Sequence, residues 1–135
     1  MLHIDIVCIG KIREKYLKDA IDEYKKRLSK YCILNIIELP DEKLPSKLND
    51  SISFEIKQKE SNLILSHIKK DSYVIALDLK GKNYTSVEFS NKIQDLSLIT
   101  SHITFLIGGT LGMTEELLSN TKELICFSKM TFPHQ

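Results

Sequence analysis

The chain has 135 residues, of which 42% are hydrophobic and 27% are charged, and its formal net charge is +1. These values are typical of one ordinary globular domain that can bury a core without disulfides or metals, and the charge argues neither for nor against nucleic acid. No apolar run approaches the ~18 residues of a membrane span, and the N-terminus lacks the features of a signal peptide, so we expect a cytoplasmic protein.

The cysteines and histidines predict no metal site. Cys8, Cys32 and Cys126 each lie in an apolar run and form no C-x-x-C pair, so buried, reduced thiols are the simplest interpretation. The four histidines also lack the spacing of metal ligands.

The first half of the chain alternates strand and helix patterns. Leu2 to Ile9 predicts a buried strand, and Lys11 to Lys30 predicts a helix with eight Lys or Arg against four Asp or Glu. Its apolar residues recur at helical spacing and are expected to face inward: Ile12, Tyr16, Leu17, Ala20, Ile21, Tyr24 and Leu28. Cys32 to Leu39 predicts a second strand, which a polar loop from Asp41 to Asn49 separates from a helix over about Ser51 to Lys69. The inward residues of that helix are Ile52, Ile56, Leu63, Ile64 and Ile68.

The second half continues the alternation. Ser72 to Leu79 predicts a third strand, followed by a turn at residues 80–83. Thr85 and Glu88 have the spacing of a capping box, which predicts a helix to about Leu98 with Phe89, Ile93 and Leu96 inward. A fourth strand (Ile103 to Ile107), a helix with its cap at Thr114 that ends at Ser119, and a fifth strand (Glu123 to Phe127) complete the set.

This order predicts the fold class. Strands that alternate with helices pair in parallel, and helices cover both faces of the sheet, so we expect one three-layer α/β domain over residues 1–135. Ligands bind such sheets at the carboxyl ends of the strands. Those ends carry Gly10, Leu79 to Gly81, Gly108-Gly109, and the segment from Ser128 onward.

Each candidate site has an ordinary alternative. The Gly108-Gly109-x-x-Gly112 pattern fits a ligand loop and a tight turn about equally, since it lacks the spacing and position of a dinucleotide fingerprint. The basic first helix could bind RNA phosphates, although a solvated face is the commoner meaning of such a pattern. Asp78 could be a functional carboxylate or an acid at a strand end, and His134, Ser128 and Thr131 are weak candidates for catalysis.

Longer motifs resemble a known family. F-L-I-G-G-T-L-G (residues 105–112) and I-C-F-S-K-M-T-F-P-H-Q (residues 125–135) resemble the signature of the large-subunit ribosomal RNA methyltransferase H family of the SPOUT class. Upstream, V-C-I-G-K-I-R-E-K-Y, L-P-D-E-K and L-D-L-K-G-K-N-Y-T-S-V-E-F-S are similar to further blocks of that family, so the resemblance covers essentially the whole chain.

The resemblance implies an S-adenosylmethionine-dependent enzyme that methylates N3 of a pseudouridine in the decoding-centre stem-loop of 23S ribosomal RNA, within the assembled ribosome. It also implies a homodimer, a C-terminal trefoil knot and no metal. Matched by position, the cofactor contacts fall on eight residues: Leu77, Gly108, Phe127, Ser128, Lys129, Met130, Thr131 and Phe132. No residue is assigned as a catalytic base.

The resemblance also extends beyond the last residue of this chain. Family members continue past P-H-Q into a further helix, which is associated with the dimer interface and the substrate. For a chain that ends at Gln135 we therefore expect an incomplete cofactor pocket, a weakened dimer and little or no activity. The alternative function is a truncated, catalytically inactive α/β binding or assembly module.

Overall fold

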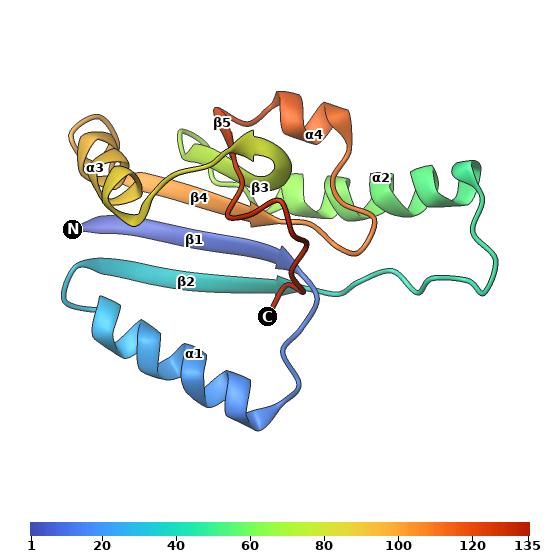
Figure 1. Cartoon of the computed structure of the whole chain (residues 1–135), viewed down its shortest axis with the longest axis horizontal. Helices are drawn as coiled ribbons and strands as arrows, with labels where there is room; N and C mark the ends of the chain where they lie inside the picture. The colour runs from blue at the N-terminus through green and yellow to red at the C-terminus, as the bar shows by residue number, and fades with distance from the viewer.

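A computed structural model describes all 135 residues as a parallel sheet and four helices (Figure 1). The sheet has the order β2-β1-β4-β3-β5, with every neighbouring pair parallel. Its strands are β1 (Leu2–Ile9), β2 (Cys32–Leu39), β3 (Tyr73–Lys82), β4 (His102–Ile107) and β5 (Glu123–Ile125). The helices are α1 (Lys15–Leu28), α2 (Asp50–Ser66), α3 (Ser86–Ser97) and α4 (Glu115–Ser119). The order of elements and the α/β class predicted from the sequence are confirmed.

Two apolar clusters lie on opposite faces of the sheet, because side chains alternate between faces along each strand. On one face, Val7, Val74 and Leu106 pack with residues of α2 and α4, including Ile64 and Leu117. On the other face the buried side chains come from three strands and from α3: Ile75, Ile103, Ile125 and Leu96. The helices thus form layers on both sides, as the sequence predicts.

Side-chain caps start two of the helices where the sequence places them. The Thr85 hydroxyl accepts a hydrogen bond from the Glu88 N–H at 3.1 Å, and the Glu88 carboxylate accepts one from the Thr85 N–H at 2.9 Å. This capping box fixes the start of α3. The Thr114 hydroxyl caps α4 in the same way, by accepting from the Leu117 N–H at 3.1 Å.

The predicted inward face of the first helix is not buried. Helix α1 runs beside β2 at the edge of the sheet (Figure 1), and none of its residues is buried. Tyr16 and Tyr24 are largely exposed. The predicted helix is confirmed, but it lies against the edge of the sheet, so little surface is available to cover its apolar side.

The end of β3 differs from the predicted turn. Residues 80–82 belong to the strand, and Ile125 of β5 pairs with both Leu77 and Lys82 of β3. The chain therefore curls around β5 between these two partners, as the looped end of β3 in Figure 1 shows. Gly81 permits this close passage, because a Cβ there would lie 2.5 Å from the carbonyl carbon of Ile125. The trefoil knot itself stays a prediction.

A cluster of polar side chains fixes the start of the short strand β5. The Glu123 carboxylate accepts hydrogen bonds from the hydroxyls of Tyr73 and Tyr84 and forms an ion pair with Lys92 Nζ at 2.6 Å. Burial would raise the pKa of Glu123, but these partners outweigh it and leave the pKa below its ordinary value. The cluster ties β5 to β3 and α3, and so fixes where the tail after β5 begins. That strand ends at Ile125, two residues before the predicted end.

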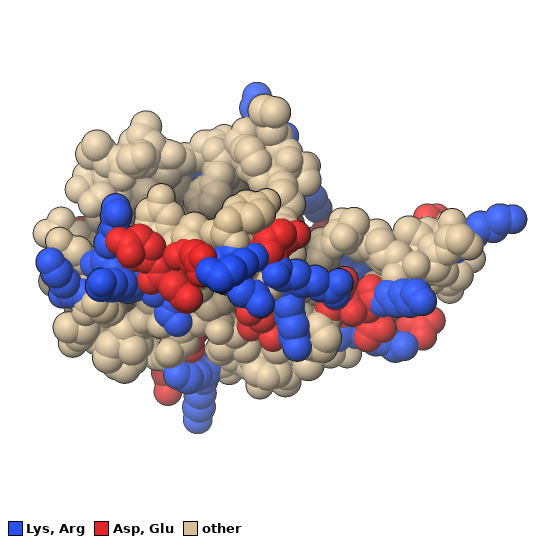
Figure 2. All heavy atoms as spheres, turned by 90° about the horizontal axis from the view of Figure 1, so that it is seen from below, with Lys and Arg blue, Asp and Glu red and all other residues tan.

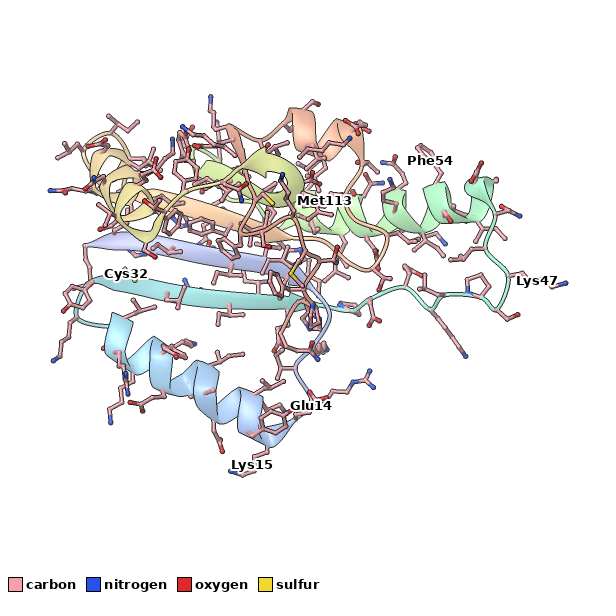
Figure 3. All side chains as sticks on the ribbon, in the orientation of Figure 1. Glu14, Lys15, Cys32, Lys47, Phe54 and Met113 are labelled. Carbon is pink, nitrogen blue, oxygen red and sulfur yellow. The ribbon has the colours of Figure 1, made fainter.

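The loop between β2 and α2 projects away from the sheet. Every residue from 40 to 50 is exposed. Figure 3 shows Lys47 at the tip of this loop, with Phe54 on the first turns of α2 beyond the body of the sheet. The polar loop predicted over residues 41–49 is confirmed.

The three cysteines are free and buried. Burial, together with the charge of Glu38, raises the pKa of Cys8 to about 11, so this thiol is protonated at neutral pH. No helix is long and apolar enough to cross a bilayer.

Candidate functional site

The register of the sheet brings the predicted site segments to one level. Leu77 of β3 pairs with Ile107 of β4 on one side and with Ile125 of β5 on the other. Gly108 directly follows Ile107, and Phe127 lies two residues beyond Ile125. Because all strands run in parallel, these three segments leave the sheet at the same edge, which is the carboxyl edge where the fold class predicts a ligand site.

The tail after β5 is held at both of its ends. At its start, the Cys126 N–H donates to the Lys82 carbonyl at 3.0 Å, and Asn83 Nδ2 donates to the Cys126 carbonyl at 2.7 Å. At its far end, the imidazole of His134 packs on Gly10, at the end of β1. Since β4 lies between β3 and β1 in the sheet, the tail crosses the end of β4, and Figure 1 shows this course.

The contact between His134 and Gly10 requires a glycine. Gly10 has a φ of +110°, and a Cβ there would lie 2.9 Å from His134 Nε2 and Cε1. Nε2 is buried without a hydrogen-bond partner. His134 thus serves as a packing anchor for the tail.

Between the two anchors the tail presents apolar side chains to solvent. Phe127 and Met130 are each 71% exposed and Phe132 is 61% exposed, which is unusual for such large apolar groups. The Met130 N–H donates to the Ser128 hydroxyl at 3.1 Å, while Lys129 and Thr131 are exposed. A small cavity of about 130 Å³ lies beside Phe127, Cys126 and Tyr84. The segment thus offers apolar surface and free backbone groups at the edge where ligands bind.

The glycine turn follows β4 at the same carboxyl edge of the sheet. The Gly112 N–H donates to the Gly109 carbonyl at 2.9 Å, and Gly112 has a φ of +83°, so the segment is a tight turn. A Cβ on Gly108 would lie 2.9 Å from Met113 Cγ, so the turn folds closely onto its own exit. The glycine pattern therefore forms the predicted tight turn. The ligand-loop interpretation also stays open, because this turn lies at the carboxyl edge of the sheet.

Helix α2 holds this turn through two consecutive buried residues. Glu60 is 4% exposed and Ser61 is 2% exposed. The Thr114 N–H donates to Ser61 Oγ at 3.0 Å, and the Glu60 carboxylate lies against Gly109. Sequence reasoning missed Glu60, although a signal was present: it lies four residues after Ile56 and four before Ile64, on the buried face of the helix.

Charged residues at the rim form ordinary surface contacts. Lys80 Nζ lies 2.9 Å from Glu115 Oε1, and this pairing raises the pKa of Lys80 and lowers that of Glu115. Asp78 Oδ1 accepts from the Lys80 N–H at 2.9 Å, a local contact within β3 where the strand begins to curl. No three His, Cys, Asp or Glu side chains gather into a possible metal site.

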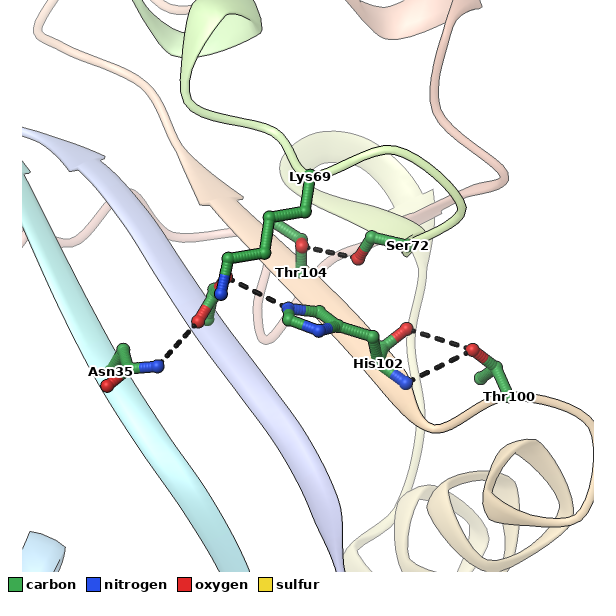
Figure 4. A network of polar contacts seen from close by, with 7 residues as sticks. Asn35, Lys69, Ser72, Thr100, His102 and Thr104 are labelled. Carbon is green, nitrogen blue, oxygen red and sulfur yellow. Dashed lines mark hydrogen bonds and ion pairs between the residues drawn. The ribbon is translucent and has the colours of Figure 1, made fainter.

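A second polar network lies near the opposite edge of the sheet (Figure 4). Asp5, 1% exposed, accepts from His102 Nε2 at 2.9 Å and Asn35 Nδ2 at 3.1 Å, and lies 3.5 Å from Lys69 Nζ. Burial would raise the pKa of Asp5, but these partners outweigh it and leave the pKa below its ordinary value. Because His102 is the first residue of β4, the network is separate from the candidate site and stabilises the fold.

The face that carries α1 is mixed in charge. Figure 2 shows Lys and Arg side chains interleaved with Asp and Glu along this face. Within α1, Lys15 pairs with Asp19 at 2.8 Å and Arg27 pairs with Glu23 at 3.1 Å. Part of the predicted basic face is therefore neutralised locally, whereas Lys25 and Lys26 are not paired in this way.

Known proteins resemble this chain along its whole length. A family model described as "Predicted SPOUT methyltransferase" matches residues 2–135. Ribosomal RNA large subunit methyltransferase H of Clostridium botulinum (strain Kyoto) is 58% identical over 135 residues, which cover 99% of this chain and 85% of that protein. Methyltransferase H 1 of Clostridium perfringens (strain SM101) and methyltransferase H of Clostridium tetani (strain Massachusetts) are each 53% identical with the same coverage.

Proposed function

The chain belongs to the ribosomal RNA large subunit methyltransferase H family of SPOUT methyltransferases, and from this premise we propose its specific reaction. The proposed reaction transfers a methyl group from S-adenosylmethionine to N3 of a pseudouridine in the decoding-centre stem-loop of 23S ribosomal RNA, in the assembled ribosome. The observation that carries the proposal is the register that aligns Leu77 with Ile107 and Ile125. It supports one cofactor site built from Leu77, Gly108 and the tail from Phe127 to Phe132.

The residues at this edge fit the proposed cofactor. Adenine and the thioether carbons need apolar contacts, and Met130, Phe132 and Phe127 offer exposed apolar side chains. Leu77 and Gly108 are partly buried at the same edge. When bound, the cofactor supplies a methyl group on a positively charged sulfur, which is electrophilic without a metal.

The contribution of the protein is mainly to position the two reactants. A tail anchored at Cys126 and at His134 would, in this proposal, keep its backbone amides and carbonyls fixed between the two anchors. Such fixed groups orient a ligand and exclude water at little further entropic cost, and orientation alone can lower a reaction barrier substantially. No side chain at the site is assigned as the base that removes the N3 proton.

The proposed partners are the ribosome and a second copy of the chain, in the cytoplasm. The half-buried Lys25 and the exposed Lys26 of α1 are candidates for phosphate contacts, and the uncovered Tyr16 and Tyr24 supply apolar surface on the same helix. Replacing Lys25, Lys26 and Arg27 with Glu is expected to weaken ribosome association and to reduce its salt dependence. Unchanged association at low salt would remove this helix from the RNA interface.

Two measurements test the reaction. Titration calorimetry with S-adenosylmethionine is expected to show binding, and a dissociation constant above about 1 mM would contradict the proposal. Transfer of a labelled methyl group to ribosomes that lack this modification then separates the enzyme from the alternative, since binding without transfer indicates a non-catalytic module.

A further inference from the structure

Glu60 is an unusual residue to find inside the α2 interface. It lies on the face that Ile56 and Ile64 bury, and only 4% of its surface is exposed. A buried carboxylate is costly unless several donors compensate it, yet the protein donates one hydrogen bond to it, from the Glu42 N–H to Oε2 at 3.0 Å. An amide or an apolar side chain would fill this place at lower cost, so packing alone does not explain the carboxylate.

The position of Glu60 links three segments at the carboxyl edge. Its Oε2 holds the loop that follows β2, through Glu42. Its Oε1 lies 2.6 Å from the point that a Cβ on Gly109 would occupy, so the carboxylate rests directly on the glycine turn. The methyl group of Ile9, at the end of β1, lies 3.1 Å from the same point. The carboxylate therefore sets how far the turn after β4 stands from β1 and β2.

Ser61, the residue after Glu60, makes a second contact between α2 and the turn. Ser61 Oγ accepts from the Thr114 N–H, so α2 contacts the turn at Gly109 and again at its exit into α4. Gly108, a proposed cofactor contact, immediately precedes Gly109. The contacts between α2 and the turn therefore also fix the position of Gly108. A shift of Glu60 would move the turn without touching the sheet pairs of β4.

We propose that Glu60 is a positioning residue for the cofactor site, which holds the Gly108–Gly112 turn against the loop after β2 at the distance that cofactor binding requires. This inference rests on the proposed function for its ligand and on the contacts of Glu60 for its geometry. Burial, with the charges of Asp41 and Glu42 adding to it, raises the pKa of Glu60. The raised pKa indicates that burial disfavours the ionised carboxylate, so keeping it at this position costs folding free energy.

The test compares three variants by amide hydrogen exchange and by titration with S-adenosylmethionine. Glu60→Ala is expected to speed exchange at the amides of Glu42 and Gly112, while the amides of the central strands stay protected. Its affinity for S-adenosylmethionine should fall about tenfold, because the turn is no longer held in place. Glu60→Gln keeps an acceptor for Glu42 and should restore affinity to within about threefold of the original protein. The control is Glu55→Ala on the same helix, whose side chain is 68% exposed and which should change neither measurement.

A second substitution probes the contact from the other side. Gly109→Ala places a methyl group against the Glu60 carboxylate and should weaken binding, and adding Glu60→Ala should recover part of that loss. If Glu60→Ala does not fold, Gly109→Ala and Glu60→Gln carry the same comparison. Cofactor affinity in Glu60→Ala and Gly109→Ala equal to that of the original protein would overturn the positioning role. If the original protein binds no cofactor while exchange at Gly112 still depends on Glu60, the proposed function fails and the structural clamp stands.

Discussion

Replacing Gly81 with alanine tests the close passage of β3 around β5. The new Cβ would lie 2.5 Å from the Ile125 carbonyl carbon, 2.6 Å from the Ile125 nitrogen and 2.7 Å from the Leu124 carbonyl carbon. Carbon atoms pack best about 3.5–4.0 Å apart, so this methyl group overlaps three backbone atoms by roughly 1 Å. Backbone atoms in a paired strand cannot rotate away, and either β5 or the curl must move.

The effects of overpacking in other proteins give the expected loss of stability. Extra methyl groups in well-packed sites destabilise proteins by about 1–3 kcal/mol, and contact with paired backbone places Gly81→Ala at the upper end, about 3 kcal/mol. For a domain of this size that corresponds to a melting temperature lower by about 10 °C. Displacing β5 also moves the start of the tail at Phe127, so affinity for S-adenosylmethionine should fall by about tenfold.

Calorimetric melting and cofactor titration measure both effects. Lys80→Ala is the control, since it removes only an exposed ion pair with Glu115 and should leave the melting temperature essentially unchanged. A melting temperature of Gly81→Ala within about 2 °C of that of the original protein would contradict this prediction. It would show that the space between Gly81 and the backbone of β5 can hold a methyl group.

Three further predictions concern titratable groups. The folded state raises the pKa of Glu60 and so binds protons more readily than the unfolded chain, so stability should fall as pH rises above the ordinary value of 4.5. Glu60→Gln should flatten that part of a plot of melting temperature against pH, and an unchanged slope would contradict the burial of its charge. The pKa of Asp5 is lowered, so its stabilising contribution is full above the ordinary value of 3.8 and is lost as pH falls below it. Asp5→Ala, which leaves Lys69 and His102 without their partner, should lower the free energy of unfolding by about 1–3 kcal/mol in urea titrations, and no measurable loss would refute this role. Cys8, with a pKa of about 11, should react with iodoacetamide at pH 8 far more slowly than a free thiol, and rapid labelling in the folded protein would show that it is accessible.

Local chemistry made much of the fold predictable. Thr85 and Thr114 mark the starts of α3 and α4 in the sequence. A hydroxyl just before a helix accepts a hydrogen bond from a first-turn N–H that has no partner within the helix. The apolar runs of β1 and β2 predicted the observed bounds, since the two strands pair with each other along their whole length. These features depend on residues close together in the chain, which is why a single sequence reveals them.

Features that depend on distant neighbours were not predictable. The sequence around Gly81 has the composition of an ordinary turn, and only its contact with Ile125 explains why β3 continues to Lys82. Tyr16 and Tyr24 have the spacing of an inward face but lie at the sheet edge. Order among parallel strands is likewise set by contacts far apart in sequence, so the sheet order was not predicted.

The candidate site divides in the same way. Gly108 and the tail from Phe127 to Phe132 came from the family resemblance, and the sheet register explains how they can share one edge. Glu60 was overlooked because a charged residue in a helix usually faces solvent, and its burial depends on the position of Gly109. Sequence patterns therefore located the ligand-facing segments better than the residues that hold them in place.

An NMR titration of the ¹⁵N-labelled, 135-residue chain with S-adenosylmethionine tests the central claim most directly. The account predicts amide shifts that cluster at Leu77, at Gly108 and along residues 127–132, with little change at the hollow of about 390 Å³ formed by Met1, Leu2 and residues 97–101. Shifts centred on that hollow, at the amino edge of the sheet, would contradict the claim. So would the absence of any shift at cofactor concentrations of about 1 mM.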